Sequence, residues 1–285
     1  MVDRFGPFPL EYRVFDACGI PVYVHAFLIA YFAWQLTEQE AAVKSSGASG
    51  LPDYSKASLI ALMCLLGFLV LFLTVLVHEL GHCAGAKLVG GKVERILLWP
   101  LGGLAFCSSG GGPKGDLLVA LAGPITHAPQ YVAWMALYKV VVRSPESFGS
   151  WAPTMEGLCA QAMSLQIILV VFNLLVPIYP LDCSKVIISL CRICGASART
   201  AALFMCFLSL LVIMVLFASM FRVLSLPYLS FGWSPMNMMI VLWMGLQSYQ
   251  LYSHVSAQTE RQHPLLAQMS EGDYEPVPTR DPHDR

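Results

Sequence analysis

Residues 57–82 read ASLIALMCLLGFLVLFLTVLVHELGH, an apolar run of helix length that ends in two histidines and a glutamate. No Asp, Glu, Lys or Arg occurs from residue 57 to residue 77. About 20 apolar residues are enough for a helix to cross the roughly 30 Å hydrocarbon core of a bilayer. The stretch therefore predicts a transmembrane helix that carries ionisable side chains at one end.

Five more runs of comparable length also lack charged residues, and they cover residues 17–37, 117–138, 157–181, 200–221 and 223–252. The whole chain of 285 residues is 56% hydrophobic and 12% charged, with a mean hydropathy of +0.63. Backbone polar groups in lipid must pair within the segment, so runs of this length predict helices. We expect an all-α membrane bundle of about six transmembrane helices.

Charge placement gives an orientation and excludes one class of partner. Most of the 17 Lys and Arg residues fall on the side of the predicted bundle that holds both termini. Because cytoplasmic loops are enriched in Lys and Arg, both termini are predicted to be cytoplasmic. The net charge of -1 argues against a nucleic-acid partner, since phosphate binding needs a basic surface.

The domain organisation predicted from these patterns is simple. Residues 1–252 form one membrane domain with core helices at about 57–190, and no appended soluble domain is expected. Residues 253–285 are polar and rich in proline, and we predict a disordered cytoplasmic tail there. Between the second and third runs, residues 90–115 include KVERILLWPLGGLAFC, which predicts a short β-hairpin at the membrane surface.

The pentad His78-Glu79-Leu80-Gly81-His82 is an H-E-x-x-H pattern. Two histidines four residues apart share one face of a helix, so both imidazoles can reach one zinc ion. Zinc makes a neighbouring water more acidic, and Glu79 can take the proton and pass it to a leaving amine. Ionisable groups beside hydrocarbon are costly, which favours a functional site over a packing role.

A catalytic zinc site needs a third protein ligand and an open fourth position. Asp182 is the candidate, because it is the carboxylate that closes an apolar run, in NLLVPIYPLD from Asn173 to Asp182. Pro177 and Pro180 should break the helix just before it. Broken backbone at membrane depth is tolerated where it is buried in protein or lines a polar cavity, and a hydrolase needs such a cavity.

These segments together resemble the site-2 protease family of intramembrane zinc metalloproteases, and in particular its sporulation-factor protease subgroup. The resemblance rests on four segments, which occur in the family's order: His78–His82, Pro100-Leu-Gly-Gly103, Ala122-Gly123-Pro124 and Asn173–Asp182. It implies that zinc is the cofactor, that His78, His82 and Asp182 are its ligands, that Glu79 is the catalytic base and that Asn173 helps to hold substrate. It also implies single-pass transmembrane proteins as substrates, cleaved in regulated intramembrane proteolysis.

The sequence departs from the family pattern at three places. Cys183 and Ser184 follow the ligand aspartate where Gly-Gly is common, Val176 is an apparent insertion, and His127 occupies a position that usually holds a small or amide residue. We include His127 among the substrate-binding candidates. Alternatively, it supports the site from behind without touching substrate, or it is a histidine between helices whose hydrogen bonds are satisfied by neighbouring residues. Two other functions remain open, a catalytically inactive zinc-binding membrane scaffold and a zinc transporter.

Overall fold

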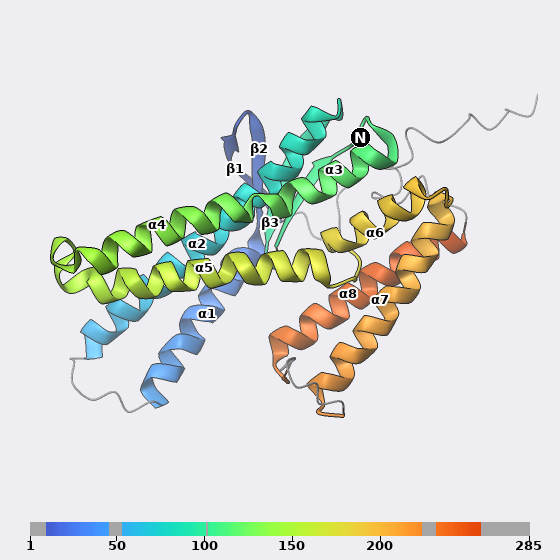
Figure 1. The fold of residues 1–285 in the computed structure, drawn as a ribbon. Coiled ribbons are helices and arrows are strands. Elements are labelled where there is room, and N and C mark those ends of the chain that lie inside the picture. The colour runs from blue at the N-terminus through green and yellow to red at the C-terminus, as the bar shows by residue number, and fades with distance from the viewer. Residues whose placement is uncertain (1–9, 46–52, 101, 224–231, 258–285) are drawn as a thin grey trace, which may run out of the picture. The chain divides into compact units, whose positions relative to one another are not determined.

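The computed structural model describes residues 10–45, 53–100, 102–223 and 232–257, and most of them are helical (Figure 1). The helices are α1 (Ala26–Ser45), α2 (Asp53–Leu88), α3 (Gly112–Ile125), α4 (His127–Arg143), α5 (Ala152–Leu175), α6 (Asp182–Ile193), α7 (Ala198–Met220) and α8 (Pro235–Ser256). The strands are β1 (Glu11–Ala17), β2 (Ile20–His25), β3 (Val93–Trp99) and β4 (Gly102–Cys107). The predicted helical bundle with a small β element is confirmed, and the sequence beyond Ala257 lies outside the described residues.

Three helical segments in the described part of the chain are long and apolar enough to cross a membrane: Ala61–Leu88, Gly149–Leu175 and Ala198–Met220. Their surfaces also suit lipid. On α5, Ile167 and Ile168 are exposed, and on α7 Phe204 and Phe207 are exposed, which a water-soluble fold would avoid as a contiguous patch. The protein is a membrane protein, while the total of six spans stays a prediction.

The chain divides into two compact units, the first within Met1–Cys83, Val93–Phe106 and Ala122–Phe172. This unit contains a four-stranded sheet in the order β1-β2-β3-β4. Strand β1 pairs with β2 in antiparallel register, and β2 pairs with β3 in parallel, with Val22 opposite Ile96. The hairpin predicted between residues 90 and 115 is therefore confirmed as β3 and β4, and it belongs to a larger sheet than expected.

The sheet of the first unit packs against α2. Leu76 and Cys83 of the helix share a buried core with Val22 of β2 and with Ile96 and Leu98 of β3. Strands β2 and β3 are apolar on the side that faces α2. Burial of apolar surface in this core stabilises the packing of the helix against the sheet. The end of α2 that carries His78 and His82 is thus held by tertiary packing.

The second unit falls within Ala84–Lys92, Cys107–Leu121 and Asn173–Arg285. Residues of α6, α7 and α8 form its core, including Ile188, Met205 and Leu251. Arg192 of α6 and Asp116 of α3 form an ion pair of 2.8 Å, and both side chains are almost fully buried. A buried pair of this kind fixes the position of α6 against α3, because either charge alone would be costly in that environment.

The predicted break before Asp182 is present. Helix α5 ends at Leu175 and α6 begins at Asp182, with Pro177 and Pro180 between them. The freed backbone is satisfied by hydroxyl groups, since the Tyr179 N–H donates to Ser209 Oγ at 2.9 Å and Ser248 Oγ donates to the Tyr179 carbonyl at 3.3 Å. This is the burial in protein that broken backbone requires at membrane depth.

Two of the predicted spans have a different local structure. Residues 20–25 of the first run form β2, so the helix starts only at Ala26. The third run is divided at Thr126 into α3 and α4. Pro129 explains the division, because a proline in the first turn of α4 is tolerated, whereas in a continuous helix its ring would collide with the carbonyl of Ile125.

Candidate metal centre

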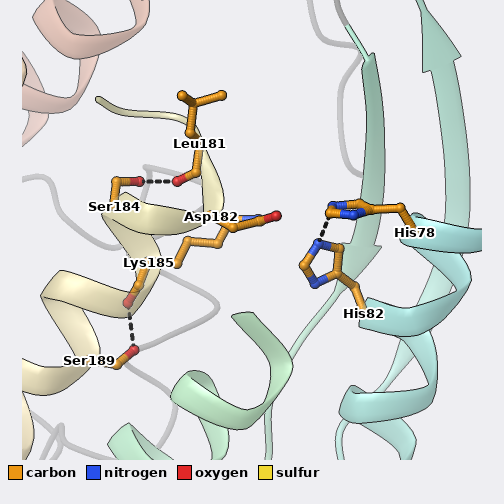
Figure 2. Close-up of polar contacts among 7 residues, drawn as sticks. All are labelled: His78, His82, Leu181, Asp182, Ser184, Lys185 and Ser189. Carbon is orange, nitrogen blue, oxygen red and sulfur yellow. Dashed lines mark hydrogen bonds and ion pairs between the residues drawn. The ribbon is translucent and has the colours of Figure 1, made fainter. Parts of the chain in front are cut away.

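His78 and His82 project from one face of α2 with their imidazoles next to each other (Figure 2). Their Nε2 atoms are 3.1 Å apart, and the two rings are nearly perpendicular, at 83°. Zn–N distances of about 2.0–2.1 Å in tetrahedral geometry place two ligand nitrogens roughly 3.3 Å apart. The two imidazoles therefore converge through Nε2 at the separation that one zinc ion requires.

Glu79 lies against the backbone of β4. A methyl group built on Gly103 would come within 2.6 Å of Glu79 Oε1 and 2.7 Å of its Cδ. Only a residue without a side chain lets the strand approach the carboxylate this closely. The glycine of the Pro-Leu-Gly-Gly segment thus sets the distance between the proposed base and the edge strand of the sheet.

The Ala-Gly-Pro segment has a similar role on the other side of α2. A methyl group on Gly81 would lie 2.5 Å from the Ala122 carbonyl oxygen, and one on Gly123 would overlap the His82 ring at Nε2 and lie 2.5 Å from its Cε1. Small residues on both helices allow α2 and the end of α3 to approach closely. This contact holds the His82 imidazole in place.

Asp182 is the first residue of α6 and is buried. Its Oδ1 is 3.3 Å from Lys185 Nζ, one turn along the same helix. Ser184 Oγ donates to the Leu181 carbonyl at 2.6 Å, which closes the turn that begins α6 (Figure 2). The carboxylate is therefore fixed at a helix N-terminus, where the helix dipole favours negative charge.

The donor set fits a zinc ion. His78 and His82 lie in the first unit and Asp182 lies in the second, and all three side chains are buried. Two imidazole nitrogens and one carboxylate oxygen form a common catalytic zinc ligand set, which leaves a fourth position open.

The two candidate substrate-binding residues occupy different environments. Asn173 is half-buried near the end of α5. His127 begins α4 and is only 1% exposed, with one ring nitrogen 3.0 Å from His78 Nδ1 and the other 2.6 Å from Gln166 Oε1. Sequence reasoning missed Gln166 and its partner Thr74. Both are uncharged polar residues inside apolar runs, and this polarity is the signal in the sequence that could have identified them.

A substitution at Gly123 tests the contact between the end of α3 and the His82 imidazole. Gly123→Ala is expected to displace the His82 imidazole, and a shift of about 1 Å in a catalytic group can lower the rate of an enzyme about 100-fold. The matched control is Gly157→Ala on α5, where an added methyl meets nothing within 4 Å. Turnover of a single-span substrate, bound zinc per chain and helical content would be measured for both. Equal zinc binding by the two variants would contradict the assigned contact.

Comparisons with known proteins match the part of the chain that contains His78 and His82. Residues 56–143 match a sequence family described as Peptidase M50B-like. A zinc metalloprotease of Methanocaldococcus jannaschii is 33% identical over 114 residues, which cover 40% of this chain and 28% of that protein. Stage IV sporulation protein FB of Bacillus subtilis is 33% identical over 130 residues, which cover 45% of this chain and 38% of that protein.

A solved structure shows the same fold. The site-2 protease from Methanocaldococcus jannaschii aligns with a TM-score of 0.52 and 20% identity, covering 84% of this chain and 94% of that one. The matches to the curated relatives span less than two-fifths of either relative's length. The Peptidase M50B-like region contains His78, Glu79 and His82. Residues 56–143 are therefore similar to Peptidase M50B-like sequences, and the chain has the fold of a site-2 protease.

Proposed function

We propose that this protein is an intramembrane protease that hydrolyses peptide bonds of membrane-anchored proteins, with His78, His82 and Asp182 holding the zinc. The observation that carries the proposal is the convergence of the two Nε2 atoms, 3.1 Å apart, beside a buried glutamate. A purely structural zinc site has four protein ligands and needs no base. A transporter would need further ionisable groups along a path across the bilayer, which the runs 200–221 and 223–252 do not carry.

We assign the protein's residues different roles in hydrolysis. When bound, zinc supplies a Lewis acid that polarises the peptide carbonyl and makes water acidic enough to attack near neutral pH. Glu79 accepts the proton from that water and delivers it to the departing amine, so that one carboxylate acts as base and then as acid. Asn173 is proposed to hold the substrate. Both termini are proposed to be cytoplasmic, from the distribution of Lys and Arg.

Strand β4 offers a way to bind the substrate. It is the last strand in the sheet order, and its Gly103 backbone lies against Glu79. A transmembrane helix hides its carbonyl groups in hydrogen bonds, so a substrate must unwind before it can be cleaved. An extended segment that pairs with β4 would present its backbone next to Glu79, in the manner of strand addition.

The test is a cleavage assay with purified protein in detergent. Single-span membrane proteins are screened first, and the cleaved region is then supplied as peptides that are N-methylated at successive positions. If the peptide pairs with β4, methylation at alternate positions should lower kcat/KM about fivefold, because one backbone hydrogen bond contributes roughly 1 kcal/mol. The intervening positions are the control. Cleavage that ignores the position of the methyl group would argue against strand addition.

A further inference from the structure

His78 is joined to a chain of hydrogen bonds that starts and ends on α2. His78 Nδ1 is 3.0 Å from His127 Nε2, His127 Nδ1 is 2.6 Å from Gln166 Oε1, and Gln166 Nε2 is 3.1 Å from Thr74 Oγ1. Thr74 lies one helical turn before His78 on α2, while His127 begins α4 and Gln166 lies on α5. The chain therefore links three helices in a closed loop.

All four members of this chain are buried, with exposed fractions of 6% for His78, 1% for His127, 1% for Gln166 and 2% for Thr74. In such surroundings a polar group without a partner is costly, so the loss of one member affects its neighbours. The four residues of this hydrogen-bond chain are also uncharged, apart from the titratable histidines. Its members therefore contribute hydrogen-bond donors and acceptors in a fixed order.

The direction of these hydrogen bonds follows from the metal-binding atom. His78 faces His82 through Nε2, and ligation uses the Nε2 lone pair, which leaves the ring proton on Nδ1. The Nδ1–H then donates to His127 Nε2, so the proton of His127 lies on its Nδ1. The His127 Nδ1–H donates to the side-chain oxygen Oε1 of Gln166, and the side-chain nitrogen Nε2 of Gln166 donates to Thr74 Oγ1. Each donor thus meets one acceptor.

We propose that His127, held by Gln166 and Thr74, is a positioning residue that fixes the tautomer and ring orientation of His78 for zinc binding. The proposal rests on the zinc site of the proposed function and assigns a role to a residue that departs from the family pattern. Metal-binding histidines depend on a partner for their second ring nitrogen, and losing that partner lowers metal affinity about 10- to 100-fold. A histidine that only packs between helices would have no such effect.

Two substitutions at one position separate hydrogen bonding from packing. His127→Leu keeps a side chain of similar size but removes both hydrogen bonds. His127→Gln carries a carbonyl oxygen as far from the backbone as Nε2, where it can accept from the His78 Nδ1–H, and it is the matched control. Gln166→Leu is a second variant, which removes the acceptor for His127 Nδ1–H and leaves His127 itself in place.

Zinc affinity would be measured by competition with a chromophoric chelator on the full chain in detergent, with helical content and melting temperature recorded for each variant. We expect zinc affinity to fall about 10- to 100-fold for His127→Leu, to fall less for Gln166→Leu and to recover for His127→Gln. An unchanged affinity in His127→Leu, or equal losses in the His127→Leu and His127→Gln variants, would overturn the inference. Failure of the wild type to bind zinc would instead overturn the proposed function.

Discussion

Replacing Glu79 with glutamine is expected to lower kcat by at least about 100-fold while bound zinc stays unchanged. General acid–base catalysis contributes roughly 10²- to 10⁴-fold, and an amide cannot take a proton from water near neutral pH. Glutamine has nearly the same shape as glutamate, which matters because Gly103 leaves no space beside the Glu79 carboxylate. Turnover of a single-span substrate and zinc per chain would be measured on the same preparation.

Glu94→Gln is the matched control for this substitution. Glu94 is exposed on β3, and the same chemical change there should leave both turnover and zinc content at wild-type values. A Glu79→Gln variant that cleaves as fast as this control would exclude Glu79 as the base. Loss of zinc in Glu79→Gln would show that the glutamate is a ligand, contrary to its assigned role.

Asp182→Ala is expected to remove both zinc and activity. Loss of one of three protein ligands should weaken zinc binding by more than the roughly 10- to 100-fold that loss of an outer hydrogen-bonding partner causes. The residue is buried at the start of α6, where its carboxylate is held in place by the helix turn. Zinc affinity measured by chelator competition tests this, with Asp182→Asn as a smaller change of the same group.

The ion pair with Lys185 provides the control for Asp182. If Asp182→Ala acts only by breaking this 3.3 Å pair, then Lys185→Ala should have the same effect. If Asp182 is a ligand, Lys185→Ala should retain zinc, because the ammonium group competes with the metal for the carboxylate. Equal zinc loss in the two variants would assign Asp182 a structural role.

The membrane bundle and the metal-binding helix could be predicted because their signals are local. His78 and His82 are four residues apart, and the prolines that end α5 lie within five residues of Asp182. The β3–β4 hairpin was recognisable from its turn segment. In each case the residues that determine the feature are neighbours in the sequence, so helical period and turn chemistry are sufficient.

Features that depend on distant contacts were missed. Strand β2 was taken for part of a transmembrane run because it lacks charge, although IPVYVH after a Cys-Gly turn has strand character. Its parallel pairing with β3, which lies about 70 residues later, gives no local signal. The same holds for His127 and Gln166, which are 39 residues apart and meet only through the packing of α4 and α5.

The most direct test of the central claim is a zinc titration of the metal-free wild-type chain, with bound zinc and cleavage of a single-span substrate measured on the same samples. We predict that the rate rises in proportion to bound zinc and reaches its maximum at about one zinc per chain, as a single site with three protein ligands requires. Full cleavage by the metal-free chain, or tight binding of one zinc without cleavage of any substrate in the panel, would contradict the account.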